Sequence, residues 1–144
     1  MVGDTTGMID PRVKIDVTLG ADFLKVFAAA QEAADGDAKE RLEALERMGP
    51  PRFFAVAGEG ATAAVGACAV EGQWAGIFAM RTHPDHRRRG IGRRVLSTLL
   101  AHAEQSGAGR AYLQVEAANF GAIDLYRRAG FSEAYRYGYW VRGA

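Results

Sequence analysis

Alternation of apolar and polar residues marks the strands of this chain. Val13, Ile15 and Val17 alternate with polar neighbours, which predicts a half-buried strand over residues 12–18. Residues 134–142 alternate in the same way, and strand-like runs over 52–57, 62–70, 73–82 and 110–116 predict further strands. Short Gly-containing segments separate the first three of these at hairpin spacing, so we expect hairpins between them.

Apolar residues at three- and four-residue spacing mark the helices. The longest predicted helix covers about residues 90–106, and its inward positions are Ile91, Val95, Leu96, Leu99 and Ala103. A shorter helix over about residues 120–129 buries Ile123 and Tyr126. A glycine follows each helix, Gly107 in one case and Gly130 in the other, where a helix commonly ends.

Two earlier helices are predicted between the first and second strands. Asp22 can cap one and Asp37 the other, which stops before Pro50. The order β-α-α-β-β-β-α-β-α-β predicts one mixed α/β (α+β) domain over residues 12–144. Residues 1–11 are polar and contain glycine, so we expect them to form a flexible lead-in.

Composition limits the class of protein. The chain has 144 residues and is 49% hydrophobic, enough for one core. Its 18 basic and 17 acidic residues leave a net charge of +1, so we expect no nucleic-acid or membrane partner. Cys68 is the only cysteine, no secretory leader is visible, and the longest apolar stretch, 61–70, is too short to span a membrane. We expect a cytoplasmic protein, and a homodimer remains open.

An anion site is predicted where the strand over residues 73–82 leads into the long helix. Gly90 and Gly92 let a ligand approach the backbone, and the first-turn N–H groups of a helix lack intrahelical partners. Positive charge around them comes from Arg87, Arg88, Arg89, Arg93 and Arg94. The glycine patterns of dinucleotide-binding folds and ATP-binding loops are absent here. The segment therefore favours a diphosphate.

The motif Arg-x-x-Gly-x-Gly, present as Arg87-Arg88-Arg89-Gly90-Ile91-Gly92, resembles the pyrophosphate-binding loop of GCN5-related N-acetyltransferases (the GNAT family). A second segment, from Asn119 to Phe131, resembles the family pattern Asn-x-x-Ala-x-x-Leu-Tyr…Gly-Phe and follows in the family's order. The close resemblance covers residues 52–140. It implies a single GNAT-like domain, a mixed sheet whose central strands splay apart, and acetyl-CoA as cosubstrate.

The resemblance also implies which residues hold acetyl-CoA. Arg87 opens the motif, and the pyrophosphate would be bound by the backbone amides of Arg88, Arg89, Gly90, Ile91, Gly92 and Arg93. The exposed backbone of the strand end, Met80, Arg81 and Thr82, would hydrogen-bond the pantetheine arm. Asn119 would contact the pantetheine or orient nearby backbone. Tyr126 would lie near the sulfur and protonate the departing thiolate.

The general base is not fixed by the sequence. Many family members carry a glutamate on the strand before the loop, but residues 73–82 contain no carboxylate. Glu116 is the candidate by position, Glu71 is a poorer one, and a water chain ending on backbone carbonyls is equally admissible. The loop residues His83, Asp85 and His86 are expected in a turn rather than at a metal.

The acceptor side differs from the family pattern. In the family the acceptor lies between the first two helices and a C-terminal hairpin, but only 13 residues follow Phe131 in this chain. The hairpin is therefore missing, very short, or completed by a partner chain. Tyr135, Tyr137 and Tyr139 share one face of the last predicted strand, where they pack against a helix or line the acceptor pocket.

The main prediction is an acetyl-CoA-dependent N-acetyltransferase that transfers acetyl to a primary amine of a small molecule or peptide by direct attack. The sequence shows no nucleophile with an adjacent base, which favours direct attack. The alternative is a CoA-binding module without turnover, either half of a split or tandem acetyltransferase or a sensor. A nucleic-acid-binding domain using Arg87–Arg94 is a third possibility, which the near-neutral charge disfavours.

Overall fold

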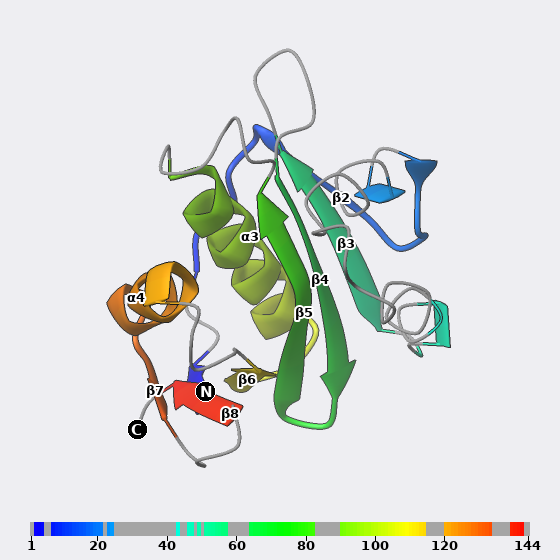
Figure 1. Cartoon of the computed structure of the whole chain (residues 1–144). Helices are drawn as coiled ribbons and strands as arrows, with labels where there is room; N and C mark the ends of the chain where they lie inside the picture. Colours follow the sequence, from blue (N-terminus) through cyan, green and yellow to red (C-terminus); the bar gives the residue numbers. More distant parts are fainter. Residues whose placement is uncertain are drawn as a thin grey trace.

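Figure 1 shows the computed structural model of the chain. The structure describes residues 2–4, 7–21, 23–24, 43, 46–47, 49, 51–57, 64–82, 90–114, 120–133 and 139–142. Within these ranges no helix is long and apolar enough to cross a membrane.

Eight strands form one mixed sheet in the described part of the chain. In sheet order they are β1 (Val2–Asp4), β7 (Phe131–Glu133), β8 (Tyr139–Arg142), β6 (Arg110–Gln114), β5 (Trp74–Thr82), β4 (Ala64–Glu71), β3 (Arg52–Ala57) and β2 (Val13–Asp16). Neighbours are antiparallel except β5 and β6, which run parallel. β1 also pairs with β6.

Two described helices cover one face of this sheet. α3 (Ile91–Gln105) is the crossover between the parallel strands β5 and β6, and α4 (Phe120–Arg128) follows β6 on the same face (Figure 1). Both are followed by a glycine of positive φ, 97° at Gly107 and 94° at Gly130, as the sequence predicts. Residues 21, 23–24, 43 and 46–47 are also helical, where the two earlier helices are expected; the other positions predicted for those helices lie outside the described residues.

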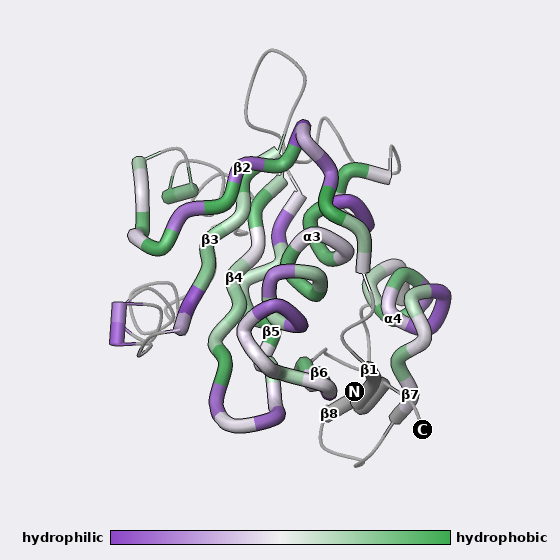
Figure 2. Tube along the Cα trace, turned by 180° about the vertical axis from the view of Figure 1, so that it is seen from behind, coloured by the Kyte–Doolittle hydropathy of each residue, from purple (hydrophilic) through white to green (hydrophobic). Residues whose placement is uncertain are grey.

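The main core lies between α3, α4 and the sheet. All five positions predicted to face inward from α3 are buried, together with Ile123 and Tyr126 of α4. β3 and β4 are hydrophobic along nearly their whole length (Figure 2), as expected of central strands covered on both faces. Side chains that point to the opposite face form a second cluster of Phe23, Phe54, Val65 and Ala67.

The lead-in departs from the expectation of a flexible segment. Val2–Asp4 forms β1, and residues 7–10 pack along α3. The backbone N–H of Met8 donates to Ser97 Oγ at 2.8 Å, and that of Asp10 donates to Thr98 Oγ1 at 3.2 Å. This contact buries a second side of α3. Thr98 and Leu100 are therefore buried, although they were not among the inward-facing positions predicted for this helix.

Of the C-terminal strand predicted over 134–142, residues 139–142 form β8, and residues 134–138 lie outside the described residues. The chain forms a short hairpin, in which β7 pairs antiparallel with β8 and β8 pairs with β6. The sequence left open a missing, very short or partner-completed hairpin, and the second of these is found. Strands of three and four residues are too short to show a clear period, so their boundary was not visible in the pattern.

Candidate active site

The described pairing of the parallel strands β5 and β6 ends in the middle of the sheet. Their pairing runs from Trp74 opposite Arg110 to Ile77 opposite Leu113, and there it ends. β5 continues to Thr82 and stays paired with β4 on its other edge. Within the described residues, no strand pairs with the β6-facing edge of 78–82. The described pairing thus ends at Ile77, where the resemblance implies that the two strands splay, while residues 115–119, which follow β6, lie outside the described residues.

A β-bulge lies on the splayed segment of β5. Phe78 pairs with Ala67 and Arg81 with Val65, so two residues of β5 oppose Gly66 alone. One of the two, Ala79, has a φ of 55°, a conformation that costs an alanine ~1–2 kcal/mol. A Cβ on Gly66 would lie 2.4 Å from Met80 Sδ, so any other residue at this position would have to displace the Met80 side chain.

The N-terminus of α3 lies beside the splayed end of β5. Gly90 precedes the helix with a φ of 74°, no side chain caps the first turn, and that turn carries no acidic residue. A Cβ on Gly92 would lie 3.3 Å from Thr82 Oγ1 and 3.8 Å from Leu125 Cδ2. The uncapped N–H groups and the dipole of α3 both create positive potential at its N-terminus. Because Gly92 lies beside Thr82, this potential acts at the end of β5.

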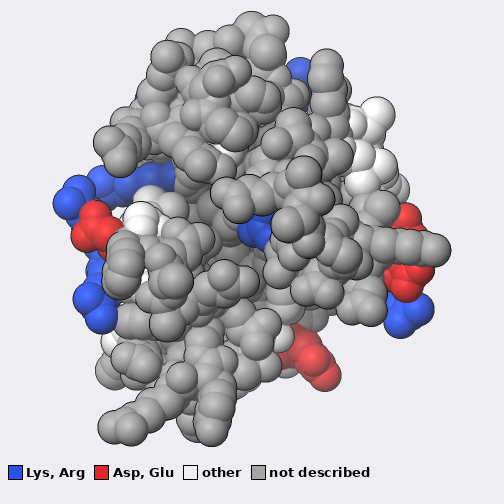
Figure 3. All heavy atoms as spheres, viewed as in Figure 1, with Lys and Arg blue, Asp and Glu red and all other residues white. Residues whose placement is uncertain are grey.

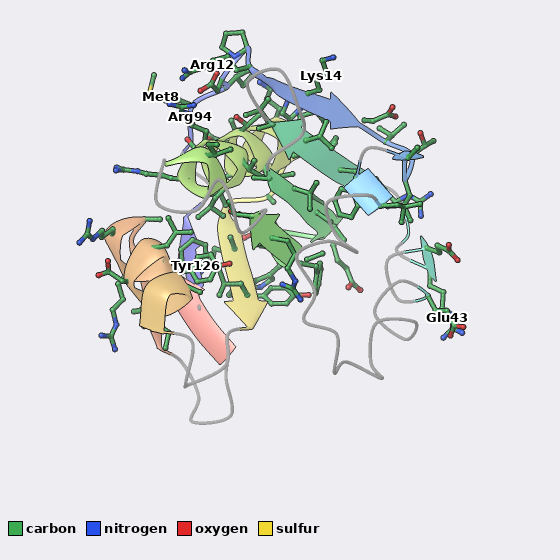
Figure 4. All side chains as sticks on the ribbon, turned by 45° about the horizontal axis from the view of Figure 1, so that its top comes forward. Met8, Arg12, Lys14, Glu43, Arg94 and Tyr126 are labelled. Atoms are coloured by element: carbon green, nitrogen blue, oxygen red, sulfur yellow. The ribbon has the colours of Figure 1, made fainter. Side chains whose placement is uncertain are left out.

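Tyr126 projects from α4 towards the sheet (Figure 4). Its side chain is only 6% exposed, and its ring centroid lies 6.0 Å from that of Phe131. Burial raises the pKa of the Tyr126 hydroxyl to about 12, and the nearby positive charge of Arg81 partly opposes that rise. Within the described part of the chain the hydroxyl has no hydrogen-bond partner, so it is a buried donor that a ligand can satisfy.

The structure brings most of the described candidates together. Met80, Arg81 and Thr82 are half-buried at the splayed end, and the helix start supplies Gly90, Ile91, Gly92 and Arg93. The candidates outside the described residues are Arg87, Arg88, Arg89, Glu116 and Asn119, as well as His83, Asp85 and His86. Glu71 pairs with Trp74 at the start of β5, away from the splay. Among the described residues no group of His, Cys, Asp or Glu could hold a metal ion.

Aromatic side chains line the opposite face of β5 and β6. The ring of Tyr112 lies 6.2 Å from that of Trp74 and 6.0 Å from that of Phe78, and the Arg110 guanidinium lies 5.0 Å from the centre of the Trp74 ring. Gly76 leaves the space for this stripe, because a Cβ there would lie 2.6 Å from the Phe78 ring. The stripe begins at the splay and was not predicted from the sequence.

Sequence reasoning also missed the bulge. Ala79 is an ordinary strand residue and gives no signal of its conformation. Gly66 is the available signal, because a glycine inside a strand often marks a bulge or a close approach of other atoms. Arg81 was considered only for its backbone, whereas its side chain also lies at this site.

Known proteins share this fold and this order of elements. A model of the acetyltransferase (GNAT) family matches residues 21–131. The ribosomal-protein-S18-alanine N-acetyltransferase of Escherichia coli superposes with a TM-score of 0.69 at 27% identity, over 85% of this chain and 79% of that one. A GNAT-family acetyltransferase of Staphylococcus aureus superposes with a TM-score of 0.70 at 16% identity, over 86% of each chain, which shows likeness of fold alone.

Curated relatives agree with the structural match. The bS18-alanine N-acetyltransferase of Escherichia coli (strain K12) is 40% identical over 58 residues, which is 40% of this chain and 39% of that protein. Streptothricin acetyltransferase of Streptomyces lavendulae is 35% identical over 119 residues, 81% of this chain and 61% of that protein. The chain therefore spans less than two thirds of these relatives' length. It belongs to the acetyltransferase (GNAT) family.

Proposed function

We propose that this protein is an acetyl-CoA-dependent N-acetyltransferase that transfers the acetyl group to a primary amine. One observation carries the proposal. Within the described residues the pairing of the parallel strands ends at Ile77 and Leu113, and β5 continues to Thr82 beside the N-terminus of α3, where no side-chain cap is found at Gly90. Peptide groups on the open edge of β5 suit the amides of pantetheine, and uncapped N–H groups at a helix start suit a diphosphate.

The residues divide between two parts of the cofactor. The backbone of Met80, Arg81 and Thr82 binds the pantetheine arm in this proposal. The pyrophosphate is held by the loop and the first helical turn, through Arg87, Arg88, Arg89, Gly90, Ile91, Gly92 and Arg93. Asn119 contacts the pantetheine or orients nearby backbone. The Gly92–Thr82 contact supports the division, because it places the helix start next to the end of β5.

The chemistry follows from the needs of the amine and the thioester. An alkyl ammonium titrates near ~10, so the site must take a proton before the amine attacks. Glu116 or a chain of water molecules serves as base. A backbone N–H at the bulge can meet the charge that develops on the thioester oxygen. Tyr126 donates its proton to the departing sulfur.

A direct transfer is favoured over a covalent enzyme intermediate. Cys68 is fully buried within β4, and burial raises the pKa of its thiol to about 12. A thiol held neutral inside the core cannot act as a nucleophile. The relatives named above act on a ribosomal protein and on streptothricin, which supports an amine acceptor but leaves small molecules and peptides both open.

The test combines binding and turnover. Calorimetry with CoA and release of free thiol from acetyl-CoA, over a panel of small amines and peptides, should both be positive. Gly92→Glu places a carboxylate where the diphosphate would lie and should weaken CoA binding by roughly a hundredfold or more. Gly109→Glu adds the same charge at an exposed position with open space around it, and should bind CoA as the wild type does.

The outcomes separate the candidate functions. Binding without thiol release for any amine would support a CoA-binding module, which the absence of a carboxylate on β5 also favours. Equal CoA affinity in folded Gly92→Glu and wild type would refute the assignment of the loop.

A further inference from the structure

A carboxylate from the lead-in lies beside the first turn of α3. The Asp10 side chain is only 16% exposed, and its Oδ2 lies 4.0 Å from Arg94 Nε. Arg94 closes the first turn, because its backbone N–H donates to the carbonyl of Gly90 at 3.2 Å. Figure 4 places Arg12 and Arg94 together at this end of the helix. A negative charge thus lies next to the helix end to which the proposed function assigns a diphosphate.

The Asp10 carboxylate is held in this position by hydrogen bonds on two sides. Its own backbone N–H donates to Thr98 Oγ1 of α3 at 3.2 Å. The carboxylate accepts hydrogen bonds from the backbone N–H of Arg12 at 2.9 Å, from Nε at 3.0 Å and from Nη2 at 2.9 Å. Two residues earlier, the backbone N–H of Met8 donates to Ser97 Oγ. The carboxylate is therefore fixed against α3 and cannot turn away from Arg94 without breaking these contacts.

The surroundings of Asp10 favour negative charge. The first turn of α3 has no acidic residue and no side-chain cap, and Arg93 is exposed there. Most charged residues described on α3 and α4 are basic, and basic atoms accordingly prevail on that side of the molecule, at the left of Figure 3. The dipole of α3 adds positive potential at its start. Asp10 uses this potential in the protein without ligand, and a bound diphosphate would use the same potential.

We propose that Asp10 is a positioning residue of the cofactor site, which holds the Arg94 guanidinium against the lead-in and lowers the affinity of the α3 start for a diphosphate. The inference rests on the proposed function, because it assumes that the diphosphate of CoA binds at this end of α3. Asp10 then stabilises the protein without ligand and opposes the charge of the ligand. The lowered affinity also favours release of CoA after the acetyl group has been transferred.

The test removes the charge and keeps the shape. In D10N the amide oxygen can still accept hydrogen bonds from Arg12, but Arg94 loses its counter-ion and can turn towards the diphosphate. Calorimetry at low ionic strength should show that D10N binds CoA about three- to fivefold more tightly than the wild type. The difference should shrink at high salt, where charges this close to the surface are screened.

A second ligand separates charge from structure. Acetyl-pantetheine carries the thioester without any phosphate, so its KM should be the same in D10N and the wild type. The loss of the charge interactions of Asp10 should make D10N less stable than the wild type at neutral pH, while its affinity for CoA rises. A purely structural role would instead lower stability and affinity together. If D10N does not fold, D10S, which keeps an acceptor oxygen for the Arg12 backbone, takes its place.

Two further variants locate the effect. D16N removes the charge from another hydrogen-bonded aspartate of the N-terminal region, whose carboxylate bonds Thr18, and should leave the affinity for CoA unchanged. R94Q removes the guanidinium that Asp10 holds. In the R94Q background, D10N should lose most of its gain in affinity, because the cation that it releases is absent.

The two proposals fail separately. If wild type binds CoA and D10N binds it equally or more weakly, the role of Asp10 is wrong while the proposed function stands. The inference is also wrong if D10N changes the KM for acetyl-pantetheine as much as the affinity for CoA, or if its gain is the same with and without Arg94. If the wild type does not bind CoA, the proposed function fails and the inference fails with it.

Discussion

Tyr126 is a polar residue that the fold surrounds with apolar side chains. Its hydroxyl is buried and has no hydrogen-bond partner within the described residues. Burying a polar group without a hydrogen-bond partner destabilises the folded state by ~1–3 kcal/mol. A residue that served stability alone would not need to carry this cost. Such a cost is common where a group serves a ligand or a reaction. Its retention at the splay supports a role in the chemistry.

The variant Tyr126→Phe separates these two effects. Removing the hydroxyl should leave CoA affinity unchanged and slow thiol release about tenfold, because a thiolate leaves readily and needs limited assistance. The free energy of unfolding should stay level or rise by up to ~1 kcal/mol, since an unsatisfied group is lost. Steady-state assays and urea unfolding measure both. Tyr112→Phe, on the neighbouring strand, is the control, and an unchanged rate in Tyr126→Phe would remove the residue from the mechanism.

Among the elements, β5 combines two tasks that conflict in an ordinary strand. Its first half pairs on both edges and builds the sheet, and within the described residues its second half pairs with β4 alone, on the edge away from the proposed ligand. The bulge at Ala79 marks the change between the halves, and its positive φ shows that the strand is strained there. Strain of this kind persists only where the surrounding structure imposes it.

Ala79→Gly tests whether the bulge is strained. Glycine tolerates this φ, so the variant should be as stable as the wild type or more stable by up to ~1 kcal/mol, after the entropic cost of glycine is counted. The matched change Ala75→Gly lies at a fully buried, regular position of the same strand and should cost ~1–2 kcal/mol. Urea unfolding compares the two. Equal losses in both variants would show that Ala79 is not strained.

A second element, the segment before β2, fixes the chain to α3. Asp10 accepts hydrogen bonds from the side chain and the backbone of Arg12, and its carboxylate lies 4.0 Å from Arg94 Nε of α3. Figure 4 shows Met8, Arg12 and Arg94 together at the start of α3. The hydrogen bonds from Arg12, with the charges of both arginines, hold the pKa of Asp10 at about 2 instead of 3.8.

This lowered pKa makes stability depend on pH in a defined direction. Because the folded pKa lies below the unfolded one, ionised Asp10 stabilises the fold above about pH 4, and this contribution is lost as pH falls through about 2. Asp10→Asn should therefore be less stable than the wild type at pH 7, with a difference that shrinks between pH 4 and 2. Urea midpoints over a pH series measure it. A constant difference over that range would contradict the role of the charge.

For the whole molecule, the sequence predicts elements whose pattern is local. The predicted bounds of α3 and β3–β5 agree with the observed bounds within one or two residues. Each of these elements packs one or both faces against a core, and the spacing of its apolar residues shows this in the sequence. The loop glycines and Tyr126 could be proposed as site residues because their motifs are contiguous, and their roles stay predictions. The splay was implied by the family resemblance, and the described pairing of β5 with β6 ends at Ile77, where the resemblance puts it.

What the sequence did not show depends on partners that are distant in the chain. β1 has three residues and pairs with β6, more than a hundred positions later, so nothing near it signals a strand. Thr98 is buried by the lead-in, and the Ala79 bulge is set by Gly66 on the adjacent strand. These features come from tertiary contacts, which override local preference.

The contact between the lead-in and α3 makes a last prediction. Gly7 passes so close to α3 that a Cβ there would lie 2.1 Å from the backbone oxygen of Ser97. A backbone atom cannot rotate away, so Gly7→Ala must displace the segment and should cost ~1–3 kcal/mol. Gly109→Ala meets open space and should be neutral. Urea unfolding of both variants decides whether residues 7–10 belong to the folded unit, because an unaffected Gly7→Ala would mean that the lead-in does not hold α3 in solution.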